Sequence, residues 1–242
     1  MTRYALYFSP PENSAWSTAG NRWLGRDPVS GAAVAQCTIP GVSCRMLAKL
    51  TTDARRYGLH ATLKAPFRLL AVFSEAHLLT MAQTFSAMQT PIVLQDTHVR
   101  PMGTFLALRP RGPLPVIGAL AMHCVAYFDL LRDMPSAAET AKRRNAGLSL
   151  RQEALLQRWG YPYTEEEYCF HITLTDSLAG MDDDTVFAIR KAAEACFAAA
   201  QASTPLVIDA LSIFKEDAPG APLTMWRRFP FQGKPTATGQ LL

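Results

Sequence analysis

Two short segments of the sequence, residues 59–63 and 170–174, carry the same pattern: an apolar residue, histidine, an apolar residue, threonine and leucine. In a β-strand alternate side chains share a face, so each histidine would project beside the threonine two positions later. These four residues are His60, Thr62, His171 and Thr173. An imidazole can take or give a proton near neutral pH, and a hydroxyl can donate a hydrogen bond. If both segments face one cleft, they supply an acid, a base and two donors, a set that suits chemistry at a phosphate.

The elements that must position these groups follow from apolar periodicity, capping residues and breakers. Strands are predicted over residues 3–9, 59–70, 92–99, 104–109, 168–175, 206–214 and 223–231. Helices are predicted from Asn13 or Ser14 to Leu24, over 43–56 after a Ser43 cap, over about 14 residues from Ser74, two or three times within 114–160, and over 182–202.

The order strand, helix, strand, strand occurs from residue 59 and again from residue 168. This repeated order predicts an internal duplication about a pseudo-twofold axis, which would bring both histidine segments to one cleft. We therefore expect a single bilobal α+β domain over residues 1–242. Lobe one would cover about 1–112, a helical connection 113–160 and lobe two about 161–232.

The composition indicates an ordinary globular protein, with 49% hydrophobic and 18% charged residues in a chain of 242. There is no run of about 18 apolar residues, and the apolar run at the N-terminus is too short for a signal peptide, so we expect a cytoplasmic protein without a membrane partner. The five cysteines form no C-x-x-C pair, which argues against a disulfide framework or a zinc ribbon. A net charge of +4 favours anionic partners only weakly.

One histidine–x–threonine segment alone is a weak signal, since the histidine is better explained as a core residue bonded to the threonine hydroxyl. Two copies on predicted strands in matching element orders favour a functional reading. The two tetrapeptides, residues 60–63 and 171–174, resemble the paired motifs of the 2H phosphoesterase superfamily. Residues 3–8, 23–27, 57–64 and 159–163 extend the resemblance to the branch encoded in phosphonate-utilisation operons.

The resemblance implies two α+β lobes with antiparallel sheets around a central cleft, and hydrolysis of cyclic phosphodiesters. In this mechanism one of His60 and His171 is the base and the other the acid, and the sequence does not say which. Thr62 and Thr173 would bind the non-bridging phosphate oxygens. Neither a metal nor a cofactor is required. The sequence contains no H-E-x-x-H zinc motif, no G-x-x-x-x-G-K-[ST] loop and no G-x-G-x-x-G segment.

Other candidate phosphate ligands follow from strand alternation. Lys64 lies two residues after Thr62 and is expected to face the cleft; an exposed lysine at the strand end is the equal alternative. Tyr7 would line the cleft from the first strand, with core packing as the alternative. Residues 143–144 and 227–228 are arginine pairs that would recruit a second phosphate, although solvated helix and strand faces explain them better.

Three functions remain open. The first is a metal-independent cyclic phosphodiesterase acting on a small molecule, with a phosphoribosyl cyclic phosphate suggested by the phosphonate resemblance. The second is processing of RNA 2′,3′-cyclic ends or 2′-5′ ligation, against which the small net charge argues mildly. The third is a phosphate-ligand binding module without turnover, which would not need both histidine–threonine pairs. The sequence does not indicate the oligomeric state.

Overall fold

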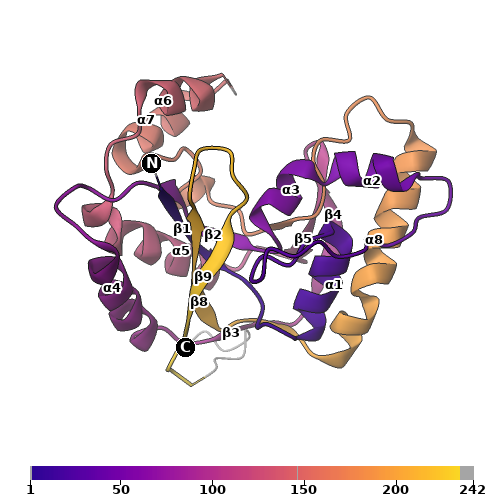
Figure 1. Cartoon of the computed structure of the whole chain (residues 1–242), viewed down its shortest axis with the longest axis horizontal. Coiled ribbons are helices and arrows are strands. Elements are labelled where there is room, and N and C mark those ends of the chain that lie inside the picture. Colours follow the sequence, from indigo (N-terminus) through magenta and orange to yellow (C-terminus); the bar gives the residue numbers. More distant parts are fainter. Residues whose placement is uncertain (1, 146, 235–242) are drawn as a thin grey trace.

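The computed structural model describes residues 2–145 and 147–234 (Figure 1). Its strands are β1 (Arg3–Phe8), β2 (Ala61–Phe67), β3 (Ile92–Leu94), β4 (Thr97–Met102), β5 (Phe105–Pro110), β6 (Ile172–Thr173), β7 (Leu206–Ile208), β8 (Ala210–Glu216) and β9 (Thr224–Pro230). Its helices are α1 (Ala15–Leu24), α2 (Cys44–Leu50), α3 (Thr52–Tyr57), α4 (Glu75–Ala87), α5 (Pro115–Tyr127), α6 (Ala137–Arg144), α7 (Leu150–Trp159) and α8 (Asp183–Ser203), with 3₁₀ turns η1 (Asp129–Leu131) and η2 (Glu165–Glu167).

The strands form three antiparallel sheets, which confirms the α+β prediction. One sheet has the order β2-β1-β8-β9, a second pairs β4-β5-β6, and a two-stranded ribbon joins β3 to β7. Figure 1 shows the two larger sheets apart, with α4 beside β8 and β9 and with α1 and α8 packed together near β4 and β5. Helix α5 packs on β2. Among the described residues, none of the helices is both long and apolar enough to cross a membrane.

The strands do not divide at the expected lobe boundary. The hairpin β8–β9, from the second half of the chain, completes the sheet that holds β2, and the hairpin β4–β5, from the first half, pairs with β6. The chain crosses between the sheets at β3 and β7, which pair with each other. For this reason the expected strand 92–99 is split: β3 belongs to the crossing ribbon and β4 to the hairpin. The ends of the predicted 1–242 domain, residues 1 and 235–242, lie outside the described residues.

Helix starts follow the predicted caps. The side chains of Ser14, Ser43 and Asp182 accept hydrogen bonds from backbone N–H groups three residues later, which satisfies donors that the first turn leaves free. The predicted helix over 43–56 is instead two helices, α2 and α3, separated at Thr51. The buried Thr51 hydroxyl donates to the Leu47 carbonyl at 2.9 Å, a bond that competes with regular helix geometry.

The second histidine segment forms a much shorter strand than the predicted 168–175. Only Ile172 and Thr173 pair with β5. The ladder ends after them because the Leu106 N–H donates to the Thr175 hydroxyl, at 3.0 Å. Before them, the Cys169 carbonyl accepts a bond from the imidazole of His171. Side-chain bonds therefore flank the short strand on both sides, and after Thr173 the backbone N–H groups of Leu174 and Thr175 both donate to the Leu106 carbonyl.

Candidate active site

Both motif histidines occupy the same local position. His60 and His171 each stand one residue before the strand that carries their threonine, β2 and β6 respectively. In each, Nδ1 lies within hydrogen-bond distance of the backbone carbonyl two residues earlier, 2.9 Å to Gly58 and 2.8 Å to Cys169. A carbonyl only accepts, so Nδ1 must carry the proton. The neutral rings therefore keep Nε2 free to take a proton, and this holds for both.

A glycine sets up the first of these bonds. Gly58 follows α3 with φ +73°, in the region that favours glycine. A Cβ at this position would lie 2.7 Å from the Pro28 side chain. Any larger residue would therefore shift the chain that presents the Gly58 carbonyl to His60.

The two imidazoles lie in one electrostatic neighbourhood. Burial, with a smaller contribution from the charge of His171, lowers the pKa of His60 to about 4, although the Gly58 bond acts in the opposite direction. Burial also lowers the pKa of His171, with a smaller contribution from the Arg109 guanidinium. Both rings are accordingly neutral at pH 7, and each gains a proton more readily when a negative charge enters the site.

A cavity of about 510 Å³ lies beside the edge strand β2. Thr62 lines it on one side and His171 on the other, and aromatic side chains supply much of the wall. These aromatic residues are Phe67, Phe105, Trp159, Tyr161, Tyr163 and Tyr168. The Tyr168 hydroxyl donates to the Thr62 carbonyl at 3.1 Å and so ties the segment before β6 to β2. The fold thus brings the two histidine segments, 111 positions apart, to one cavity.

Of the four motif residues, Thr62 and His171 line this cavity, whereas Thr173 and His60 do not. The ring centroid of His60 lies 4.0 Å from that of Tyr7 and 5.7 Å from that of Tyr57. Tyr7 is 1% exposed and packs with Phe214. The tyrosine therefore belongs to a small core, as the alternative reading held, while also contacting the catalytic candidate. Thr62 pairs with Tyr7 across the sheet, and Thr173 pairs with Ala107 in β5.

Lys64 does not follow the alternation on which its prediction depended. Thr62 pairs with Tyr7 but Lys64 pairs with Leu6, so a β-bulge places an extra residue, Leu63, between them. Although Lys64 contributes to the cavity wall, its ammonium donates to the Val125 carbonyl at 3.0 Å and to Asp129 at 3.1 Å. It is also not the exposed strand-end lysine of the alternative, because it is only 3% exposed.

We therefore expect Lys64→Met to act chiefly on stability. Losing two hydrogen bonds to a buried ammonium should lower the free energy of unfolding by about 1 to 3 kcal/mol. Asp129 keeps its bond to Arg132, at 2.8 Å, which limits the loss. Urea denaturation measures this change, with the exposed Lys191→Met as the control. A stable variant with a strongly raised KM for a phosphate substrate would contradict the expectation.

The low pKa of His60 also predicts how stability depends on pH. The unfolded value is 6.5 and the folded value about 4, so the folded protein binds fewer protons between these limits. The contribution of His60 to the free energy of unfolding is therefore complete above pH 6.5 and is lost as the pH decreases toward 4. Between pH 7 and pH 5 this one group lowers the free energy of unfolding by about 2 kcal/mol. Denaturation of wild type and His60→Gln at both pH values checks this. An equal pH dependence in the two proteins would contradict it.

Sequence reasoning missed Arg109 and did not anticipate the partial burial of Arg143. Arg109 is the last residue but one of β5. If the β5–β6 pairing continued by one more residue, Arg109 would lie opposite His171. Its Nη2 donates to Cys169 Sγ at 3.1 Å. Arg143 was expected on a solvated helix face but is half-buried, with its guanidinium 4.9 Å from the Tyr161 ring centroid. The register of β5 with β6 was the available signal for Arg109, whereas no local signal indicated that Arg143 would be half-buried.

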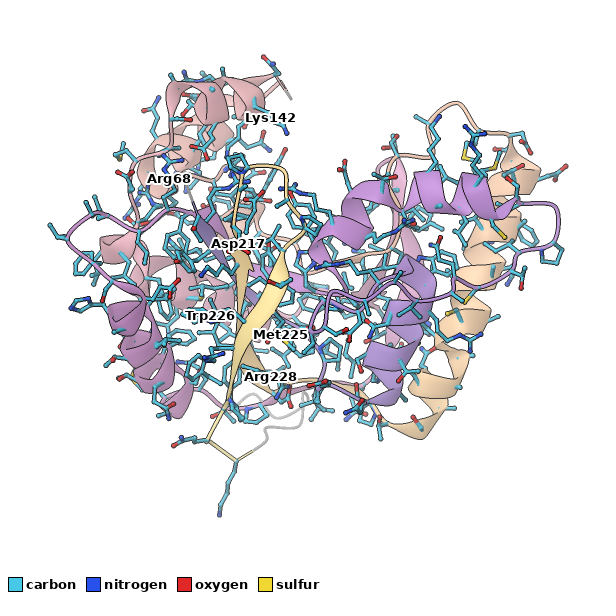
Figure 2. All side chains as sticks on the ribbon, in the orientation of Figure 1. Arg68, Lys142, Asp217, Met225, Trp226 and Arg228 are labelled. Atoms are coloured by element: carbon cyan, nitrogen blue, oxygen red, sulfur yellow. The ribbon has the colours of Figure 1, made fainter. Side chains whose placement is uncertain are left out.

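Two other members of the arginine pairs are exposed, and the third, Arg228, is part-buried. Arg144 is exposed and bonds Glu153 on α7. Arg227 is exposed over Trp226, and Arg228 bonds Asp209. Figure 2 shows Trp226 and Arg228 on β9. These three arginines are accounted for without a ligand.

Comparison with known proteins identifies relatives over most of the chain. It is 60% identical over 234 residues to a ribose 1,5-bisphosphate phosphokinase PhnN of Janthinobacterium sp. (strain Marseille), an alignment that covers 97% of this chain and 52% of the relative. It is 37% identical over 187 residues to the protein of the same name from Laribacter hongkongensis (strain HLHK9), covering 74% of this chain and 41% of that one. The chain thus spans about half the length of these relatives or less. Residues 62–224 match the model of a protein family of unknown function, DUF1045, and the chain belongs to that family.

Proposed function

We propose that this protein is a cyclic phosphodiesterase of the 2H type that needs no metal. The observation that carries the proposal is the matched pair of imidazoles. Both His60 and His171 have Nδ1 bonded to a carbonyl and Nε2 left for proton transfer, and the charge of His171 acts on His60. A structural role would not require the same tautomer twice at one site.

The reaction needs one proton removed and one supplied. Nε2 of one histidine takes a proton from water as the water oxygen attacks phosphorus. Nε2 of the other, protonated, gives its proton to the ring oxygen as the phosphorus–oxygen bond to the sugar breaks. The product is a phosphate monoester with a free sugar hydroxyl. Each positioned transfer contributes about 10²- to 10⁴-fold to the rate.

The remaining groups assist these transfers. The Thr62 and Thr173 hydroxyls donate to the non-bridging oxygens, where negative charge grows during attack. Tyr7 fixes the ring of His60 by packing against it. Lys64 shapes the cavity wall and, being paired with Asp129, contributes at most a distant positive charge.

A phosphorylated ribose is the substrate class that we favour. The two relatives are named for a ribose bisphosphate, and the sequence resembles the branch of phosphonate operons. Their names describe a kinase, but this chain matches only 52% and 41% of their lengths and contains no G-x-x-x-x-G-K-[ST] loop. We assign the kinase activity to the part of the relatives outside the match.

A second candidate substrate is a nucleoside 2′,3′-cyclic phosphate, either free or at an RNA end. The aromatic side chains of the cavity wall favour it, because a nucleobase can stack on such rings. Ligation of 2′-5′ ends would be the same chemistry reversed. A binding module without turnover remains the alternative to both.

The test is phosphodiesterase activity in excess EDTA. The panel contains phosphoribosyl 1,2-cyclic phosphate, the four nucleoside 2′,3′-cyclic phosphates, and ribose 1,5-bisphosphate with ATP. Turnover of the sugar diester supports the favoured substrate, and preference for the nucleotides supports the second candidate. Phosphorylation of ribose 1,5-bisphosphate, or binding of the diesters without hydrolysis, would contradict the proposal.

A further inference from the structure

Arg143 on α6 is a half-buried cation without a charged or hydrogen-bonded partner among the described residues. Its neighbours on the helix, Lys142 (Figure 2) and Arg144, are exposed. The guanidinium lies over the ring of Tyr161, which lines the cavity. Burial lowers the pKa of Arg143, opposed by the nearby Tyr161 hydroxyl. A desolvated guanidinium with unused donors is costly unless an anion completes it.

Three other half-buried cations of this neighbourhood are already paired. Arg3 and Arg56 both bond the buried carboxylate of Glu216, and Arg68 bonds Glu139 at 2.6 Å. Glu139 is the acidic side chain that acts on Arg143, and it already bonds Arg3 and Arg68. The capacity for another anion therefore resides in Arg143.

Hydroxyl donors accompany this guanidinium. Tyr57 and Tyr161 both interact electrostatically with Arg143, and both do so with Tyr7, the ring beside His60. The Tyr57 oxygen accepts a bond from Arg56 at 2.8 Å, so its own proton remains available for donation. One guanidinium and two phenolic hydroxyls next to the cavity match a phosphate monoester, which presents several oxygens and up to two charges.

We propose that Arg143, with Tyr57 and Tyr161, binds a second phosphate group of the substrate, a monoester on the same sugar as the cyclic diester. This inference rests on the proposed function and makes it narrower. The cyclic diester lies between the histidines, and the monoester lies toward α6. Substrates that lack the monoester are then bound less tightly and positioned less well.

The experiment compares two sugars that differ only in this group, ribose 1,2-cyclic phosphate with and without a phosphate on the 5-hydroxyl. The quantity measured is the ratio of their kcat/KM values. Arg143→Gln should reduce this ratio by about 10- to 100-fold, the range for a charged hydrogen-bonded pair. Arg143→Lys keeps the charge but not the two-pronged geometry of the guanidinium, so its ratio should lie between those of the wild type and Arg143→Gln. Arg144→Gln, the exposed neighbour, is the matched control and should retain the wild-type ratio.

A direct binding measurement separates this inference from the proposed function. Ribose 5-phosphate, which has the monoester but no diester, is titrated into wild type and Arg143→Gln by calorimetry, after circular dichroism has verified that both are folded. Binding weakened at least tenfold in the variant supports the inference even if the wild type hydrolyses neither sugar, a result that would contradict the proposed function alone. Equal affinities of wild type and Arg143→Gln for ribose 5-phosphate would overturn the inference. So would an Arg143→Gln variant whose kcat/KM decreases by the same factor for both cyclic sugars.

Discussion

Replacing His60 or His171 by alanine should lower kcat/KM on a substrate that the wild type hydrolyses by about 10²- to 10⁴-fold. Each ring presents Nε2 for one proton transfer, because its Nδ1 donates to the carbonyl two residues earlier. The two transfers belong to one step, so the double variant should be little worse than the poorer single variant.

Two further variants make this measurement specific. His98→Ala removes a histidine of β4 that pairs with Asp96 and does not line the cavity, and this variant should keep wild-type activity. His60→Asn retains more of the packing against Tyr7 than alanine does, so it separates lost chemistry from a cavity behind β2. Full activity in either alanine variant of the pair would contradict the two-histidine mechanism.

The pH profile adds an independent check on the same rings. Burial lowers both histidine pKa values, and that of His60 to about 4. One ring must be neutral and the other protonated, so kcat/KM for the free enzyme should be greatest below pH 6.5 and decrease as the pH rises above it. A substrate with only a diester phosphate keeps its own charge constant over this range. A maximum above pH 8 would contradict the assignment of both roles to these histidines.

Local features of this fold were predictable because their causes lie within a few residues. The caps at Ser14 and Asp182 each satisfy an N–H three positions along the chain, so sequence alone specifies where the helices begin. The histidine segments were visible for the same reason, since residue type and spacing define them.

Features that depend on distant partners were not predictable in this way. Strand partners are one example: β4–β5 and β8–β9 each join the sheet opposite to the expected one, and nothing in either hairpin specifies its neighbour. The bulge that places Leu63 between Thr62 and Lys64 arises from pairing with β1, nearly 60 residues earlier in the chain. Arg143 is similar, because its burial comes from Tyr161, beyond the next helix.

Replacing Glu216 by glutamine should lower the free energy of unfolding by about 3 kcal/mol. Its carboxylate is fully buried at the end of β8 and bonds Arg3, Arg56 and the Gly220 N–H. Burial alone would raise the pKa of Glu216. These bonds, of which the one to Arg3 contributes most, instead hold the pKa below its ordinary value. Neutralising the group removes the counter-charge of Arg56 and leaves Arg3 with Glu139 alone. Both guanidinium groups are about one fifth exposed, which places the loss at the lower end for buried pairs.

This carboxylate also connects the sheet to the site. Arg56 bonds both Glu216 and the Tyr57 hydroxyl, and the Tyr57 ring lies beside His60. The variant should therefore lose activity at temperatures where it is still folded.

Guanidinium denaturation gives the stability change, and a double-mutant cycle with Arg3→Met should show a coupling of about 0.5 to 3 kcal/mol. The exposed neighbour Asp217 (Figure 2) provides the control, since Asp217→Asn should change stability by less than about 0.5 kcal/mol. A Glu216→Gln protein as stable as the Asp217 control would mean that water already compensates both arginines, and that His60 is positioned without this ion-pair network.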